Sequence, residues 1–201
     1  MRKNVFILCC LGMVILLNHS AFSQKITIEK SYPEAFLRAY DNYVNKNYAA
    51  SFEQFSALVE QTPQDREELL QDIMFYRASS AYEMMNKDAD ALLCEFISLC
   101  PQSAHCNEAY FLLANFYARG ERYDQAIEVY SKMNVAILNQ DDKFEYYYKR
   151  GHCLFMLNRY DEALEEFDKV KDAKSKFAAP STYFYAHILY EQGRYNLALK
   201  E

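Results

Sequence analysis

The tetrapeptide YDQA at residues 123–126 recurs as YDEA at 160–163 and as YNLA at 195–198. The copies begin 37 and 35 residues apart, and an aromatic-rich segment lies upstream of each copy. An arginine precedes the tyrosine every time, as Arg122, Arg159 and Arg194. Self-similarity at a period of roughly 20–50 residues is the sequence signature of a repeat protein, in which each unit packs only on its neighbours. The recurrence therefore predicts an array of short structural units.

The pattern of apolar residues and turn formers predicts that these units are helical. From Tyr32 onward the apolar residues follow a helical period, and strand-like alternation is absent. Pro63 and Pro101 fall between predicted helix pairs, whereas Gly120 and Gly193 fall inside a pair, where a left-handed residue ends a helix at little cost. We therefore expect helix hairpins near 32–63, 66–101, 107–138, 144–172 and 179–201.

The three later units resemble the tetratricopeptide repeat (TPR), whose pattern is W-x2-L-G-x2-Y, then A-x3-F, then P over about 34 residues. The matching positions are Tyr110, Leu113, Ala114, Tyr117, Ala126 and Tyr130, then Tyr147, Gly151, Leu154, Ala163 and Phe167, then Tyr185, Ala186, Leu189 and Ala198. Arg150 departs from the pattern. The resemblance implies an all-α, TPR-type α-solenoid of about five antiparallel helix hairpins forming a right-handed superhelix, with the small residues where two helices nearly touch.

The first two units fit the pattern less closely. Their candidate positions are Phe36, Ala39, Tyr40, Tyr43, Phe52 and Phe55, then Phe75, Ala78, Ser79 and Tyr82, with either Ala89 or Ala91 in the small-residue place. Residues 171–201 also resemble the N-terminal part of long exported TPR proteins of Bacteroidota-type bacteria. Because the sequence stops inside the second helix of the fifth hairpin, we expect the array to be truncated and the natural protein to be longer.

The first 23 residues have the layout of a cleavable signal peptide. A cationic start, Arg2-Lys3, precedes an apolar stretch at 5–17, and the small-x-small triplet 21–23 follows. We expect cleavage after Ser23 and a location in the periplasm or on the periplasmic side of the outer membrane. The alternatives are an uncleaved anchor and a lipoprotein modified at one of the two adjacent cysteines, Cys9 and Cys10.

Composition excludes several classes of function. The formal net charge is −6, and it becomes −8 without residues 1–23, so no basic surface for nucleic acid is expected. No motif of a serine hydrolase, a zinc protease, a Cys-x-x-Cys metal site or a Gly-rich phosphate loop occurs. The acid pairs at 141–142 and 165–166 are expected on exposed surfaces. We therefore predict that the protein is no enzyme and needs no cofactor or metal, and that membrane association is indirect or through an unseen region.

The resemblance implies that the first helices of successive hairpins line a concave groove that holds extended peptides, here from envelope proteins. The predicted partner-binding residues are Tyr40, Tyr76, Asn115, Tyr148, His152, Tyr183, His187 and Tyr190. Phe36, Phe111 and Phe155 share this register and either line the groove or pack against the second helices. The cationic clamp that some TPR proteins use for a carboxylate is not expected, because aromatic residues occupy most of its positions.

Two questions stay open at the level of sequence. Cys100 and Cys106 flank a short connection and could form a disulfide, or they could be small buried residues like Cys94 and Cys153. The predicted function is an exported protein-protein interaction scaffold or adaptor. One alternative is the receptor or regulatory arm of a longer envelope protein or enzyme whose effector domain lies beyond residue 201, and another is glycan binding on the aromatic surface.

Overall fold

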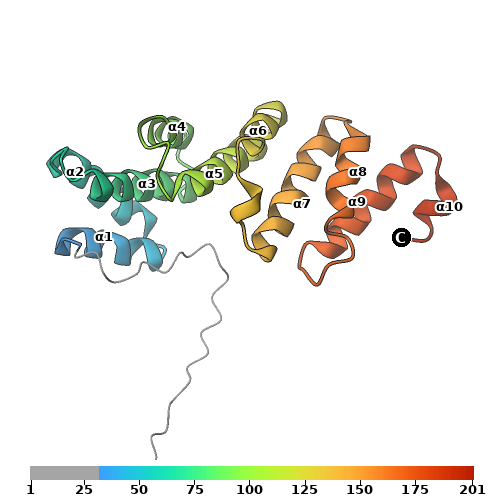
Figure 1. Cartoon of the computed structure of the whole chain (residues 1–201), viewed down its shortest axis with the longest axis horizontal. Coiled ribbons are helices and arrows are strands. Elements are labelled where there is room, and N and C mark those ends of the chain that lie inside the picture. The colour runs from blue at the N-terminus through green and yellow to red at the C-terminus, as the bar shows by residue number, and fades with distance from the viewer. Residues whose placement is uncertain (1–31) are drawn as a thin grey trace, which may run out of the picture.

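The computed structural model describes residues 32–201, and this part of the chain folds into ten α-helices and one short 3-10 helix. Figure 1 shows them as successive pairs along an elongated molecule, with α1 and α2 at one end and α9 and α10 at the other. The helices are α1 (Glu34–Val44), α2 (Tyr48–Gln61), α3 (Glu67–Glu83), α4 (Ala89–Leu99), α5 (Cys106–Arg119), α6 (Tyr123–Tyr130), η1 (Val135–Ile137), α7 (Gln140–Met156), α8 (Tyr160–Asp168), α9 (Ala178–Glu191) and α10 (Tyr195–Ala198).

The packing order gives the array an inner and an outer row of helices. Each α-helix packs on the next one along the chain. In addition, α3 touches α1 and α5, and α7 touches α5 and α9, whereas no such succession joins the even-numbered helices between residues 32 and 201. The odd-numbered helices, which are the first helices of the hairpins, therefore lie side by side. We call them the inner row, and they are the helices that were predicted to line a groove.

The same turn joins the two helices of every hairpin. A residue with left-handed backbone lies between them in all five cases, with φ of 63° at Lys46, 55° at Met85, 58° at Glu121, 56° at Asn158 and 72° at Gly193. The N–H of the third residue after the first helix donates to a carbonyl oxygen in the last turn of that helix, as from Arg122 to Tyr117 at 2.9 Å. The expectation for Gly193 is confirmed. That for Gly120 is wrong, because its φ is −85° and Glu121 takes the left-handed place.

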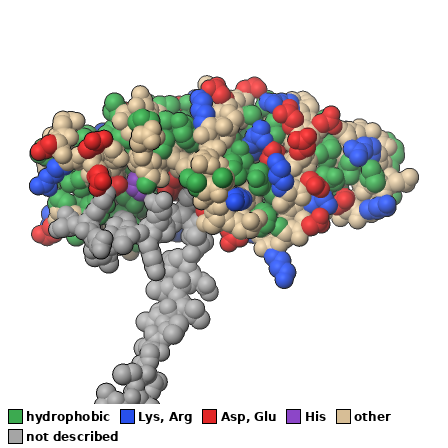
Figure 2. Space-filling model, in the orientation of Figure 1, with side chains coloured by type: hydrophobic (Ala, Val, Ile, Leu, Met, Phe, Trp, Pro, Cys, Tyr) green, Lys and Arg blue, Asp and Glu red, His purple; other side chains and the backbone are tan. Residues whose placement is uncertain are grey.

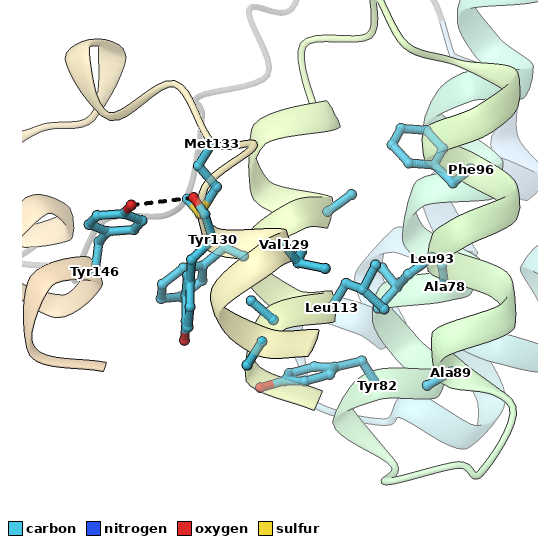
Figure 3. Close-up of a cluster of buried hydrophobic side chains, with 14 of the residues drawn as sticks. Ala78, Tyr82, Ala89, Leu93, Phe96, Leu113, Val129, Tyr130, Met133 and Tyr146 are labelled. Carbon is cyan, nitrogen blue, oxygen red and sulfur yellow. Dashed lines mark hydrogen bonds between the residues drawn. The ribbon is translucent and has the colours of Figure 1, made fainter. Parts of the chain in front are cut away.

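Neighbouring hairpins share one continuous core. Figure 3 shows residues of α3 and α4, including Ala78, Leu93 and Phe96, beside Leu113 of α5 and residues of α6. The hydroxyl of Tyr146 in α7 donates to the backbone oxygen of Tyr130 in α6 at 3.3 Å, which joins the third hairpin to the fourth. Ala89 is completely buried and Ala91 is exposed, so Ala89 fills the small-residue place in the second unit.

The structure corrects the expectation that both acid pairs are exposed. Asp141 and Glu165 are exposed, but Asp142 and Glu166 are buried. Glu166 in α8 is paired with the Arg150 guanidinium of α7, and Lys169 donates to the same carboxylate oxygen at 3.2 Å. The departure of Arg150 from the repeat pattern thus places an ion pair between the two helices of the fourth hairpin.

The predicted signal peptide, with Cys9, Cys10 and the cleavage site after Ser23, lies outside the described residues. Between residues 32 and 201, none of the helices has the length and apolar character needed to cross a bilayer.

Candidate functional site

The first two predicted partner-binding residues, Tyr40 and Tyr76, lie in an aromatic cluster of the first hairpins. Their ring centroids are 5.0 Å apart, and both rings contact Phe36. Tyr76 is only 8% exposed and also stacks with Phe55 at 5.6 Å. Most of these rings therefore face one another, and Tyr40 is the one that stays half-buried at the surface.

A second aromatic cluster joins α7 to α9. Phe184 lies at its centre, with ring centroids 5.3 Å from His152, 5.0 Å from Phe155 and 5.3 Å from Tyr183. His187 completes it at 5.5 Å from Phe155. The histidines thus pack against aromatic rings, and burial lowers the pKa of His152 below its ordinary value, so this imidazole is neutral at neutral pH.

One side of α9 presents exposed tyrosine rings to solvent. Tyr183 is 63% exposed and Tyr190 is 59% exposed. They lie seven residues apart, which places them two turns from each other on one side of the helix. Among the predicted partner-binding residues these two offer the largest accessible ring area, and they do so on an odd-numbered helix, in the inner row.

A hollow of about 250 Å³ opens between α5 and α7. It brings together three predicted partner-binding residues, which are Asn115, Tyr148 and His152. The other residues that line it are Ala118, Arg119, Tyr130, Lys149 and Cys153. Asn115, Tyr130 and Cys153 are buried and form its floor, whereas Arg119 is exposed and forms part of its rim. The remaining predicted residues lie elsewhere, in the two aromatic clusters and on α9.

Several polar groups around the hollow already make hydrogen bonds, ion pairs or cation–π contacts within the protein. The Tyr130 hydroxyl donates to Oδ1 of Asn115 at 2.7 Å. Lys149 pairs with Glu145 at 2.8 Å and lies over the Phe111 ring, 4.8 Å from its centroid. The Arg119 guanidinium lies 4.3 Å from the centroid of the Tyr82 ring. The hollow is therefore lined mainly by hydrogen-bond donors and aromatic faces.

Carboxyl groups near the N-terminal ends of α5 and α7 carry perturbed pKa values. Burial raises the pKa of Glu108 to about 8, and the charge of Asp142 adds to the effect. Burial and the neighbouring Glu145 raise the pKa of Asp142 itself to about 6. Elsewhere the charges are mixed, and Figure 2 shows acidic and basic side chains interspersed over the visible face.

Sequence register missed three residues that shape this surface, namely Arg119, Lys149 and Phe184. Lys149 and Phe184 occupy equivalent places, each two residues before the small residue of its repeat and one residue after a tyrosine that register assigned to the groove. Arg119 lies one helical turn after Asn115. The sequence could have indicated these residues, because side chains three or four positions apart, and their immediate neighbours, lie on the same face of a helix. The prediction assigned only one residue of each helical turn to the groove.

The cysteine thiols at 94, 100, 106 and 153 are free. Cys100 and Cys153 are buried, but the expectation of a buried residue is wrong for Cys94, which is exposed, and Cys106 is half-buried. Burial raises the pKa of Cys100 and of Cys106, and the two thiols lie close enough to influence each other electrostatically. A disulfide between them in oxidising surroundings stays a prediction.

Comparisons with known proteins identify the repeat. Tetratricopeptide repeat models match residues 102–136 and 144–174. MamA from AMB-1 superposes with a TM-score of 0.65 at 17% identity, covering 83% of this chain and 85% of MamA. The nearly identical TPR-like repeats of a Podosopora anserina protein described as a kinesin light chain superpose with a TM-score of 0.62 at 16% identity, covering 83% and 89%. No curated protein matches the sequence significantly.

The chain therefore contains tetratricopeptide repeats, and the predicted all-α, TPR-type solenoid is confirmed. The matches do not support the narrower resemblance to exported proteins of Bacteroidota-type bacteria.

Proposed function

We propose that this protein is an exported scaffold that binds a peptide segment of a partner protein along its inner row of helices. The observation that carries the proposal is the side-by-side arrangement of α3, α5, α7 and α9, with an open hollow between two of them and exposed tyrosines on the last. Tyrosine offers a large contact area at low entropic cost, together with a hydroxyl that orients a ligand.

Binding without catalysis fits the chemistry of the inner row. Its histidines pack against aromatic rings, and the most perturbed carboxyl groups owe their pKa values to burial. From the predicted signal peptide we infer that the protein acts in the periplasm or on the periplasmic side of the outer membrane. A partner in that compartment would be an envelope protein.

The experiment compares capture of envelope proteins by immobilised wild-type chain and by a Tyr183→Ala/Tyr190→Ala variant. Both tyrosines are exposed, so the variant keeps the fold, and circular dichroism verifies it. A Leu99→Ala/Ile137→Ala variant is the matched control, because these exposed apolar residues lie outside the inner row, at the end of α4 and in η1. We expect the tyrosine variant alone to lose partners. Undiminished capture by it would move the binding surface away from α9.

A further inference from the structure

We propose that the exposed side of α9 binds a proline-rich segment of the partner in the polyproline II conformation, with acidic residues at both ends of the prolines. The identity of this segment rests on the proposed function, which supplies a peptide ligand along the inner row. The supporting features are the spacing of two exposed tyrosines, the hydrogen-bond donors on the same side of the helix and the charge at the two ends of α9.

The spacing of Tyr183 and Tyr190 along α9 is close to the repeat of a polyproline II helix. Seven residues of α-helix rise by about 10.5 Å. In polyproline II, every third residue returns to the same side after about 9.3 Å, so two prolines three positions apart can each meet one ring. Residues on one side of an extended strand repeat at about 6.6 Å and then at about 13 Å, which matches the tyrosines less well.

A third exposed ring makes a corner beside Tyr190. Tyr195 of α10 is 55% exposed, and its ring centroid lies 5.1 Å from that of Tyr190, with an angle of 63° between the two rings. Two tyrosine rings therefore meet edge to face on the surface. Proline-rich segments dock on aromatic surfaces because the proline ring is compact and apolar, so this corner suits one of the prolines.

Hydrogen-bond donors lie along the same side of α9. Tyr183, His187 and Tyr190 follow one another at intervals of four and three residues, so their side chains share one face of the helix. Neither tyrosine hydroxyl is hydrogen-bonded to a group between residues 32 and 201. Nδ1 of His187 is buried without a partner, which favours the tautomer that carries the proton on the accessible Nε2.

A proline-rich segment is the ligand that these donors select. Polyproline II has no internal hydrogen bonds, so its carbonyl oxygens can accept, and proline has no N–H that would need an acceptor. An α-helical ligand also has a seven-residue repeat of about 10.5 Å, but its carbonyl oxygens are bonded within the helix. Three donors in a row therefore favour polyproline II over a helix.

The charge around α9 differs from that of the rest of the array. Residues 171–201 contain five basic and three acidic residues, a net charge of +2, whereas residues 32–170 contain thirteen basic and twenty-four acidic residues, a net charge of −11. Lys176 and Arg194 lie just before and just after α9, and neither has a carboxylate in ion-pair distance within the described chain. Glu191 is the only charged residue in the helix itself. Acidic residues at both ends of the ligand therefore complement these two cations.

The first test uses a peptide of seven prolines with two aspartates at each end and capped termini. Seven prolines span about 22 Å, and the 14 residues of α9 span about 21 Å. The control peptide has alanine in place of every proline and the same charge, and calorimetry with the full chain measures both affinities. We expect the alanine peptide to bind at least about tenfold more weakly, because it is not preorganised and its N–H groups lack acceptors. Equal affinities would overturn the inference.

Variants locate the bound peptide on α9. Tyr183→Ala and Tyr190→Ala should each weaken binding of the proline peptide by about fivefold or more, because each removes an aromatic contact. His187→Leu should weaken it by about threefold, whereas His187→Gln, which keeps an N–H near the position of Nε2, should bind almost as the wild type does. Leu99→Ala is the matched control, since this exposed residue lies in α4. Wild-type affinity in both tyrosine variants would show that the peptide binds elsewhere.

The flanking charges are tested by exchanging the four aspartates of the peptide for lysines. We expect the lysine version to bind about threefold more weakly, and the difference should shrink at high salt and in a Lys176→Gln/Arg194→Gln variant. A lysine version that binds as tightly as the aspartate version would contradict the assignment of acidic flanks.

Peptide binding and partner capture separate this inference from the proposed function. Absence of binding by the proline peptide, while capture of envelope proteins still depends on Tyr183 and Tyr190, rejects the proline-rich ligand alone. Peptide binding that depends on the two tyrosines, with capture unaffected by the same substitutions, supports the ligand chemistry and rejects the proposed function alone.

Discussion

A Cβ atom built on Gly151 would lie 3.0 Å from Cε1 of Phe167, in the second helix of the same hairpin, and 3.1 Å from Cβ of Glu166. Phe167 is completely buried and cannot move away without disturbing the core. Because Gly151 has no side chain, α7 and α8 can approach closely at this point, as expected for the small-residue position of the repeat.

Gly151→Leu should lower the free energy of unfolding by more than about 3 kcal/mol, because an entire side chain would have to enter this contact. Gly151→Ala should cost less, since a displacement of a few tenths of an ångström accommodates one methyl group. Thermal unfolding of both variants gives the order. Gly120→Leu is the control, because the nearest atom to its Cβ is 3.5 Å away. A Gly151→Leu protein as stable as the wild type would show that the assigned repeat register is wrong.

The turn between α5 and α6 supplies a second prediction. Glu121 has a φ of 58°, which suits glycine, whereas Gly120 has a φ of −85°, which suits any residue. Placing a glycine at position 121 should therefore stabilise the folded chain. Relief of the left-handed backbone strain by Glu121→Gly is expected to add about 0.5 kcal/mol after the entropy of the unfolded glycine is subtracted. Gly120→Ala should be neutral or slightly stabilising. If Gly120→Ala destabilised by about 1 kcal/mol or more, Gly120 would be the left-handed residue, as sequence alone indicated.

The repeat phase could be predicted because it depends on steric features that sequence records directly. Gly151 and Ala163 mark where two helices touch, and the aromatic residue four positions after Ala163, Phe167, fills the core. Which residues of the inner row would be exposed could not be predicted in the same way. The odd-numbered helices also pack on one another, so equivalent register positions are buried at Tyr76 and exposed at Tyr183.

Charge placement was harder to predict for a related reason. Two adjacent acids look alike in sequence, yet Glu165 is exposed while Glu166 is buried. The difference comes from Arg150, which lies 16 residues earlier and reaches Glu166 only after the hairpin has formed. Lys149 likewise becomes a neighbour of Asn115 only when α7 packs on α5, whereas Arg119 lies one turn from Asn115 in the same helix.

Glu108 should make stability fall as pH rises. Its ordinary pKa of 4.5 is raised to about 8 in the folded chain, so the fold favours the protonated form. The folded state then binds more protons than the unfolded state between these two values, and stability present below pH 4.5 is lost progressively up to about pH 8.

We expect Glu108→Gln to remove this loss, because the amide has the shape of the protonated acid and cannot ionise. At pH 8.5 the variant should be more stable than the wild type by at least about 1 kcal/mol, whereas at pH 4.5 the two should be equal. Urea unfolding at the two pH values measures the difference. Glu53→Gln, at an exposed position of α2, is the control. A variant that is no more stable than the wild type at pH 8.5 would mean that Glu108 ionises freely in the folded chain.

The last prediction concerns export. A helix of 13 residues, the length of the apolar stretch at 5–17, would span about 20 Å, short of the roughly 30 Å hydrocarbon core, so we expect a cleaved signal rather than a membrane anchor. Signal peptidases require small residues on both sides of the x position, here Ala21 and Ser23. The intact mass of exported protein should therefore correspond to a chain that begins at Gln24.

Two substitutions test the cleavage site itself. Ala21→Leu should block processing, because the leucine is too large for a position that takes small residues, and the precursor should accumulate with residues 1–23 attached. Phe22→Leu changes the neighbouring x position, where size is tolerated, and should be processed normally. A wild-type mass that retains residues 1–23 would instead identify an anchor. A mass increased by diacylglycerol would identify a lipoprotein and place the chain at the membrane surface through Cys9 or Cys10.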